Sequence, residues 1–374
     1  MGRGGRKQNA IETPMMVAPS FLLNPIAVGL AAAASFAVAF FQMDANPSLF
    51  FYDKCICTDR RLSNYFRGKR IWITGASAGI GAELAIQLVY HGASVVLSGR
   101  NRDRLIDVSE QCQVSTKHRC RDTDAIATAV SILPFDVNCN DDLLAKTVQT
   151  AIDMLGGSID ILILNAGQSQ LSLATDTTAT TTRQLLEVNC VAPVRLALSV
   201  LKHNLWSESM HRGHIVVLSS VAAKMAVPLS SSYAASKHAV HGYFSSLRSE
   251  HSPWLRVDLP CPGPVNTNIM ESAYTTKERQ QSSSATENKM AVDRCARLIL
   301  SGMVGPSFLF HETWIQQQPL LTLSYVQQYF PGLATLLLGK AGSLRRIMWE
   351  FDLPLYNKSS WSKAAAIWKE KQKA

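Results

Sequence analysis

Tyr233 and Lys237 lie four residues apart and could form a proton-transfer pair. In a helix this spacing places a phenol and an ammonium group on one face, where the positive charge stabilises a phenolate. The spacing alone is common, and Tyr65 and Lys69 repeat it without supporting residues. Ser220 distinguishes the first pair, because it follows a short apolar run typical of a buried strand. Ligands bind beyond the carboxyl ends of parallel strands, so we expect Ser220 and Tyr233 at a reaction site.

A second chemical feature is residues 71–81, which read as a strand, a glycine-rich turn and the start of a helix. Gly75 would permit the tight turn, and Gly79 would let backbone amides approach a pyrophosphate. Gly81 would let the helix pack closely on the strand. The helix N-terminus adds unpaired amides and partial positive charge. Glycines also serve purely structural turns, but this strand–turn–helix context predicts nucleotide binding.

Arg100 stands at the end of the next expected strand, where an acidic residue would accept hydrogen bonds from the ribose of NAD. A guanidinium instead suits a 2′-phosphate, which it can bind through two parallel hydrogen bonds. The residue therefore favours NADP(H) over NAD(H). A solvated surface arginine is the alternative interpretation.

Positioning these residues requires alternating strands and helices. Short apolar runs predict buried parallel strands at 71–74, 94–97, 159–164, 215–219 and 307–310. Helical patterns separate them at 83–91, 183–205, 233–249 and 291–301, and polar stretches at 111–124 and 271–288 read as loops. The alternation predicts an α/β fold with a single doubly wound, Rossmann-type parallel sheet over residues 70–310.

Seven motifs, in this order and spacing, resemble the short-chain dehydrogenase/reductase family. They are Thr74-Gly-xxx-Gly79-x-Gly81, Asp136-Val137, Asn165-Ala166-Gly167, Asn189, Ser220, Tyr233-xxx-Lys237 and Pro262-Gly263-Pro264-Val265-x-Thr267. Within the family, the apolar N-terminal segment and residues 262–268 resemble the membrane-anchored, 11β-hydroxysteroid-dehydrogenase-like branch. The tail that begins at Trp314 is similar to that of mammalian members. Many members carry a second asparagine where this chain has Leu164.

The resemblance implies hydride transfer between NADP(H) and a carbonyl or alcohol carbon. Tyr233 would give a proton to the developing alkoxide, or take one in oxidation, with Lys237 supporting the phenolate. Ser220 would donate a hydrogen bond to the substrate oxygen. Asn189 would hold a water that links Lys237 to solvent.

The resemblance also assigns the cofactor contacts. Asp136 would contact the adenine, residues 165–167 the ribose side and residues 262–267 the nicotinamide carboxamide. The residues expected to bind the cofactor are Gly75, Ser77, Gly79, Ile80, Gly81, Arg100, Asp136, Val137, Asn165, Ala166, Gly167, Tyr233, Lys237, Pro262, Gly263, Val265 and Thr267.

The charge distribution argues against nucleic acid as a partner. The 374 residues carry a net charge of +9, but residues 1–70 and 338–374 together carry +10, which leaves −1 for residues 71–337. A nucleic-acid-binding domain would need its basic stripe on the fold itself. The eight cysteines form no CxxC pair and no Cys/His spacing typical of a metal site, so we expect no metal.

The ends of the chain point to a membrane. Residues 1–14 form a basic tail, and 15–43 an apolar segment without charge between 17 and 43, read as a membrane anchor or a cleaved signal segment. Residues 44–69 read as a basic linker, and 311–374 as an apolar helical extension with a Lys-rich tail. Flanking Lys and Arg favour a catalytic domain that faces the cytosol, and the branch resemblance implies the endoplasmic reticulum.

The anchor and the apolar extension favour a lipophilic carbonyl or alcohol as substrate, such as a retinoid, a steroid or a keto-lipid. The alternatives are a long-chain keto-lipid reductase, acting on 3-ketoacyl or sphingoid intermediates, and a catalytically silent nucleotide-binding scaffold. The scaffold is disfavoured because Asn189, Ser220, Tyr233 and Lys237 are all present. A homodimer through helices 183–205 and 233–249 is usual in the family.

Overall fold

A computed structural model describes residues 38, 40–119, 128–204, 206, 212–276, 289–355 and 357–372. The expected tail at 1–14 and almost all of the expected anchor at 15–43 lie outside these residues, as do parts of both expected loops. Residues 42–374 form one compact unit, and the description below concerns this unit.

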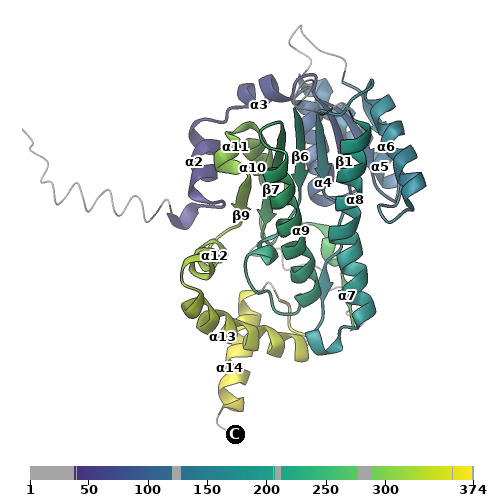
Figure 1. Ribbon diagram of the computed structural model, residues 1–374. Helices are drawn as coiled ribbons and strands as arrows, with labels where there is room; N and C mark the ends of the chain where they lie inside the picture. The colour runs from purple at the N-terminus through teal and green to yellow at the C-terminus, as the bar shows by residue number, and fades with distance from the viewer. Residues whose placement is uncertain are drawn as a thin grey trace, which may run out of the picture. The chain divides into compact units, whose positions relative to one another are not determined.

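A parallel seven-stranded sheet is the centre of the unit (Figure 1). Its order is β3 (Val130–Ile132), β2 (Ser94–Ser98), β1 (Arg70–Thr74), β4 (Ile161–Leu164), β6 (Gly213–Val217), β7 (Leu255–Pro262) and β9 (Glu312–Ile315). The strand order reverses between β1 and β4, and a doubly wound sheet binds ligands beyond such a switch point. The predicted Rossmann-type fold is thereby confirmed.

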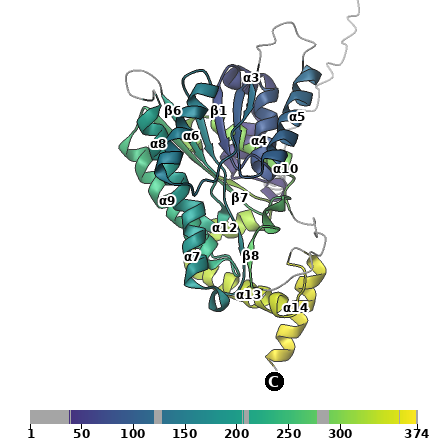
Figure 2. The same ribbon diagram turned by 90° about the vertical axis from the view of Figure 1, so that its right-hand side faces the viewer.

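Helices cover both faces of the sheet. One layer contains α4 (Gly79–Tyr90), α5 (Arg102–Arg119) and α10 (Val292–Val304), and the other α6 (Asp141–Met154), α8 (Ala192–His203) and α9 (Ser231–Glu250). Figure 2 shows α4, α5 and α10 on one side and α8 and α9 on the other. Because side chains alternate along a strand, Ile71 and Ile73 join the first apolar core and Trp72 joins the second.

The segment expected as a linker carries two helices, α2 (Pro47–Cys55) and α3 (Asp59–Phe66), both in contact with α10. Asp53 on α2 forms ion pairs with Arg294 and Arg297 on α10. The buried side chains Leu49, Leu62 and Phe66 belong to the same apolar core as the sheet. Residues from Ala45 onward are therefore packed into the domain.

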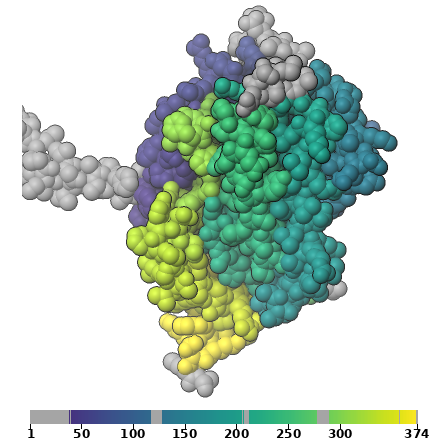
Figure 3. Space-filling view, viewed as in Figure 1, coloured from purple at the N-terminus to yellow at the C-terminus, as the bar shows by residue number. Residues whose placement is uncertain are grey.

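The C-terminal extension contains α12 (Leu320–Tyr329), α13 (Pro331–Glu350) and α14 (Lys358–Lys371). The last part of α13 packs with α14 against Leu171 and Leu229. Leu171 belongs to a small parallel sheet of β5 (Gln170–Leu171) and β8 (Tyr274–Thr275). The Lys-rich tail thus forms a packed helix, and Figure 3 shows the extension in yellow-green and yellow beside the teal residues of the domain.

Some local predictions were wrong. Residues 307–310 form a short helix, α11 (Ser307–Phe310), and the edge strand is β9, which pairs with β7. Residues 111–119 continue α5, whereas a loop was expected. Strands β3 and β7 were not expected, because β3 is short and only partly buried and β7 is interrupted by two prolines.

In the described part of the chain, the helical run Ala179–His203 is long and apolar enough to cross a membrane. It consists of α7 (Ala179–Leu186), a π-helical turn (Glu187–Val191) and α8. These elements pack on α6 and α9, and about a third of the most apolar stretch is buried by that packing.

Candidate active site

The turn after β1 has the backbone that its glycines allow. Gly75 and Gly79 have φ angles of +66° and +59°, in the left-handed region that favours glycine. A Cβ atom on Gly81 would lie 2.4 Å from the carbonyl oxygen of Gly75, so a side chain there would break the turn. Helix α4 begins at Gly79 after Ala78, which has no polar side chain to cap it. The first amides of α4 can therefore bind an anion.

Thr74 and Asn165 hold this turn in place. The Thr74 hydroxyl oxygen accepts hydrogen bonds from the backbone amides of Asn165 (3.1 Å) and Ala166 (3.3 Å). The Asn165 side-chain amide donates to the carbonyl oxygens of Gly75 (2.9 Å) and Thr74 (3.2 Å). The segment after β4, which we expected on the ribose side, is thus bonded directly to the glycine turn. Thr74 belongs to the first motif, but its role was not predicted.

The ends of β2 and β7 meet the same turn. A Cβ atom on Gly99 would lie 3.3 Å from the Ser77 hydroxyl, and one on Gly79 would lie 3.2 Å from Thr267. Arg100, which follows Gly99, is exposed at this edge. The expected cofactor residues of the turn, of β2 and of the 262–267 loop are therefore neighbours.

Other expected cofactor residues are bonded within their own loop or to a distant segment of the chain. Asp136 is exposed, and its carboxylate accepts a hydrogen bond of 2.9 Å from the Asn138 amide. Gly263 donates its amide to the Ile315 carbonyl on β9 at 2.8 Å, and Val265 forms an isolated bridge with Met290. These bonds fix the loop backbones along the carboxyl edge of the sheet.

Asn189 lies in the π-helical turn between α7 and α8 and is 1% exposed. Its side-chain oxygen accepts from the Gln168 amide at 2.8 Å, and its nitrogen donates to the Gln168 carbonyl and to the Ser236 hydroxyl, each at 2.9 Å. Such π-helical turns are frequent at functional sites. A Cβ atom on Gly167 would lie 3.0 Å from the Asn189 oxygen and 3.7 Å from the Lys237 nitrogen, which places both side chains beside Gly167.

Lys237 is buried beneath Tyr233 on α9. Its Nζ atom donates a hydrogen bond of 2.8 Å to the Leu218 carbonyl and lies 5.9 Å from the centroid of the Tyr233 ring. Burial lowers the pKa of Lys237 to about 8. Tyr233 is half-buried in the first turn of α9, and its backbone amide donates to the Gln170 side chain at 3.1 Å.

Ser220 follows β6 and begins a short 3-10 turn, Val221–Ala223, which packs against α9. Its hydroxyl oxygen accepts from the Ala222 amide at 3.1 Å and lies 3.5 Å from the Pro262 carbonyl, to which it donates. Ser220, Tyr233 and Lys237 are thus gathered at the carboxyl edge of the sheet, next to the glycine turn.

Gln170 is a site residue that the sequence did not reveal. Its side-chain oxygen accepts hydrogen bonds from the backbone amides of Ser232 (2.8 Å) and Tyr233 (3.1 Å), and so caps the helix that carries the phenol. Gln170 is fully buried in β5, sixty-three positions before Tyr233. Only the fold brings the two together, so no local sequence signal could have indicated this role.

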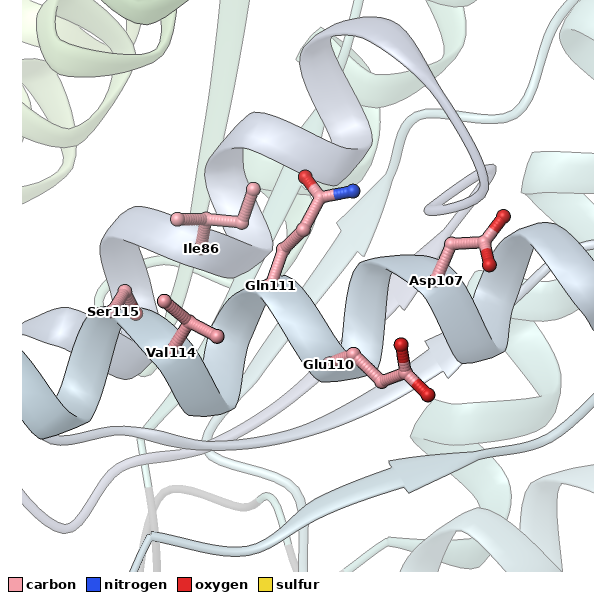
Figure 4. Close-up of a pocket in the computed structure, with 6 residues that line it drawn as sticks. All are labelled: Ile86, Asp107, Glu110, Gln111, Val114 and Ser115. Atoms are coloured by element: carbon pink, nitrogen blue, oxygen red, sulfur yellow. The ribbon is translucent and has the colours of Figure 1, made fainter.

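A surface hollow lies elsewhere, between α4 and α5 (Figure 4). It is lined by Ile86, Asp107, Glu110, Gln111, Val114 and Ser115. Its two carboxylates would repel a phosphate, and its residues are distinct from those expected to bind the cofactor. In the part of the chain that the structure describes, no cluster of His, Cys, Asp and Glu could hold a metal ion.

Several solved structures that resemble this chain are described as dehydrogenases. The alcohol dehydrogenase of Thermococcus sibiricus, complexed with 5-hydroxy-NADP, superimposes with a TM-score of 0.56 at 20% identity, over 67% of this chain and 97% of that one. A short chain dehydrogenase of Burkholderia cenocepacia in complex with NADP gives 0.54 at 22% identity, over 67% and 97%. At these identities the similarity concerns the fold alone.

Sequence comparison is more specific. The Homo sapiens protein "Dehydrogenase/reductase SDR family member 7" is 37% identical over 279 residues, which are 74% of this chain and 78% of the human protein. Its Mus musculus counterpart is 35% identical over the same shares. The family model described as "short chain dehydrogenase" matches residues 69–278. With the site geometry described above, these matches show that the chain belongs to the short-chain dehydrogenase/reductase family.

Proposed function

We propose that the protein transfers a hydride between NADP(H) and the carbonyl or alcohol carbon of a lipophilic substrate. The observation that carries the proposal is the gathering of Ser220, Tyr233 and Lys237 beside a glycine turn at the switch point of the sheet. The turn suits a pyrophosphate, because Gly75 and Gly79 adopt left-handed backbone angles and the first amides of α4 have no side-chain cap. The bound nicotinamide would supply the hydride, and the residues of this chain handle the proton and the substrate oxygen.

During reduction Tyr233 gives its phenolic proton to the developing alkoxide. During oxidation the phenolate takes the hydroxyl proton of the alcohol. Lys237 stabilises the phenolate by its charge. Ser220 donates a hydrogen bond to the oxygen on which negative charge develops. Asn189 holds the Gln168 backbone and Ser236 next to Lys237, and we assign it the water that returns the proton from solvent.

Arg100 supports NADP(H) as the cofactor. It is exposed at the end of β2, where the adenosine ribose would lie, and Gly99 before it contacts Ser77 of the glycine turn. A guanidinium there would bind the 2′-phosphate with charge-assisted hydrogen bonds.

The apolar C-terminal extension, which packs next to the strand that positions the helix of Tyr233, supports a lipophilic substrate. Leu171 and Leu229 lie in one buried cluster with Ile347 and Trp349 of α13, and Met270 packs against it. The strand that contains Leu171 also carries Gln170, which caps the helix of Tyr233. Retinoids, steroids and keto-lipids have apolar bodies that suit apolar surroundings, and long-chain 3-ketoacyl or sphingoid intermediates are the narrower alternative.

A membrane is the proposed location, with the catalytic domain facing the cytosol from the endoplasmic reticulum. Besides the apolar segment 15–43, support comes from an exposed apolar strip formed by Tyr329, Phe330, Leu333, Leu336 and Leu337. Leu336 is 73% exposed and Phe330 64%, an arrangement typical of helices that lie in a membrane interface.

The strip is connected to the start of the packed domain. The Asn46 amide donates to the Trp314 carbonyl at 2.8 Å, and the ring of Trp314 lies 4.9 Å from that of Tyr325. Tyr325 in turn stacks on Tyr329 with ring centroids 6.3 Å apart. The residues that directly follow the expected anchor are thus linked to the strip by a row of aromatic rings.

A homodimer is proposed through α8 and α9. Val191 in the π-helical turn, Leu198 on α8 and Tyr243 on α9 are large apolar residues with exposed fractions of 40%, 37% and 37%. A second copy would cover them, and the molar mass measured by light scattering in detergent tests the proposal.

The decisive experiment measures NADPH oxidation by the wild type and by Tyr233→Phe with retinal, ketosteroids and keto-lipids in detergent. Removing the phenolic proton donor should lower kcat by about 10²–10⁴-fold, with NADPH binding retained. Equal rates for both proteins with every carbonyl would instead identify a nucleotide-binding scaffold without catalysis.

A further inference from the structure

Glu312 on β9 is the centre of a partly buried polar cluster that lies outside the expected catalytic set. One of its carboxylate oxygens lies 2.7 Å from the Lys224 ammonium nitrogen and 3.6 Å from Nδ1 of His241. The other oxygen accepts a hydrogen bond of 2.7 Å from the indole nitrogen of Trp314. The Nε2 atom of His241 faces the Cys261 sulfur at 3.4 Å.

Each partner of Glu312 belongs to an element that positions a catalytic residue. Lys224 ends the 3-10 turn that Ser220 begins, and its backbone amide donates to the Val221 carbonyl within that turn. His241 lies on α9, one helical turn beyond Lys237 and two beyond Tyr233.

Cys261 extends these contacts to a third element. It immediately precedes Pro262, whose carbonyl accepts the hydrogen bond from Ser220. The Glu312 cluster therefore joins the turn that carries Ser220 and the helix that carries Tyr233, and it contacts β7 through His241.

The burial of the cluster makes Lys224 the partner that balances the Glu312 charge. The Lys224 and Glu312 side chains are 21% and 24% exposed, so solvent screens their attraction less than on an open surface. Burial and, second, the Lys224 charge together lower the pKa of His241 to about 4, so His241 is neutral near pH 7. Burial also raises the pKa of the Cys261 thiol. The other titratable groups that face His241 are Glu312 on β9, and Lys237 and His238 on the same helix.

We propose that Glu312 is a positioning residue: through Lys224 and His241 it holds the Ser220 turn against α9 and so sets the separation between Ser220 and Tyr233. This inference rests on the proposed function of the site. Loss of the carboxylate charge releases Lys224 and loosens the turn, while the glycine turn between β1 and β4 stays intact. A displacement of about 1 Å at a reacting group can cost about 10²-fold in rate, so a partly loosened turn should lower kcat by about tenfold.

The test compares full-length Glu312→Gln, Lys224→Met, Lys224→Arg and the charge-swapped double variant Lys224→Glu/Glu312→Lys. We expect kcat to fall about tenfold in the first two, with an unchanged KM for NADPH. Lys224→Arg and the double variant should recover most of the rate. Recovery by these variants separates positioning from a loss of overall stability.

Asp160→Asn is the matched control. Asp160 pairs with Arg70 at 2.8 Å with similar exposures of 23% and 28%, but at the amino end of β1, away from the site. It should lower the melting temperature without lowering kcat. The inference is overturned if Glu312→Gln keeps the wild-type kcat. It is also overturned if the kcat of the charge-swapped double variant stays as low as that of the single variants.

Hydrogen exchange gives a second readout that needs no turnover. The amides of Ala222, Ala223 and Lys224 should exchange faster in Glu312→Gln than in the wild type, because their bonds to Ser220 and Val221 open more often. Asp160→Asn should leave them unchanged. Faster exchange in a protein that reduces no carbonyl would contradict the proposed function alone, and unchanged exchange would contradict the inference alone.

Discussion

The side-chain nitrogen of Lys237 donates a hydrogen bond of 2.8 Å to the main-chain carbonyl of Leu218. Leu218 follows β6 directly and lies two residues before Ser220, so this bond ties α9 to the segment that carries the serine. Lys237 is only 6% exposed. The bond therefore orients the ammonium group beneath the Tyr233 ring at the expense of its hydration.

The ionisation of Lys237 gives activity and stability opposite dependences on pH. Burial lowers the pKa of Lys237 from 10.5 to about 8 in the folded protein. Above pH 8 the folded protein loses a proton that the unfolded chain retains up to about 10.5, so the contribution of Lys237 to the free energy of unfolding rises over this range. Over the same range kcat/KM should fall, because the phenolate loses its cation.

Rate profiles and urea unfolding from pH 7 to 10.5 test this, with Lys237→Met as the comparison. The methionine variant should be nearly inactive, and it should lack the rise in unfolding free energy that Lys237 gives the wild type. A wild-type rate that stays constant through pH 9.5 would show that the charge of Lys237 is dispensable.

Cofactor selection should depend on Arg100. A hydrogen bond to a charged group contributes about 1.5–3 kcal/mol, so Arg100→Ala should raise the KM for NADPH by about 10–100-fold and leave the KM for NADH nearly unchanged. Lys146→Ala removes an exposed charge from α6 and serves as the control. Steady-state rates with both cofactors measure the ratio. An unchanged preference in Arg100→Ala would assign selection to another residue.

Local signals explain what the sequence could predict. The turn at 75–81 could be predicted because Gly75 and Gly79 adopt positive φ angles that few other residues tolerate. Strands β1, β2, β4 and β6 could be predicted because they are buried on both faces and therefore almost continuously apolar.

The failures arise where distant partners decide the structure. Ser307–Phe310 is apolar enough for a buried strand, but it forms a helix and β9 pairs with β7 in its place. Burial alternates along β9, so β9 lacks the continuous apolar run by which the other strands were predicted. Single polar residues such as Glu312 and His241 carry no local sequence signal of their partners, and only the fold brings them together. Asp53 and Arg294 likewise meet across 241 positions, which no local pattern encodes.

The exposed apolar strip should contact lipid. In vesicles that contain a photoactivatable phospholipid, the full-length protein should crosslink at residues 329–337 of α12 and α13. Leu143 on α6 is 50% exposed but stands among polar residues, and its peptide should crosslink weakly. Replacing Leu333, Leu336 and Leu337 by serine should abolish the crosslinks at the strip. Equal labelling of both regions would argue against a membrane contact there.

The packing of α2 on α10 should fail in acid, because Asp53 maintains it. The Asp53 carboxylate is 4% exposed and accepts hydrogen bonds from Arg294 (2.5 Å), Arg297 (3.1 Å) and Ser301 (2.7 Å). Burial alone would raise the pKa of Asp53, but the bonds from Ser301 and Arg294 outweigh it and lower the pKa below 3.8. The stabilisation is therefore complete above pH 4 and is lost as the pH falls through the lowered value.

Asp53→Asn should cost about 1.5–3 kcal/mol at pH 7, because Arg294 and Arg297 lose their most buried partner and keep only the more exposed Asp44 and Asp59. It should also remove the part of the acid dependence that Asp53 contributes. Glu350→Gln, which breaks the more exposed pair with Arg346, should cost under about 1 kcal/mol. Urea unfolding at pH 7 and pH 3 measures both variants. If Asp53→Asn is no more destabilising than Glu350→Gln, α2 is held by its apolar contacts with the core, and the ion pairs only fix its orientation.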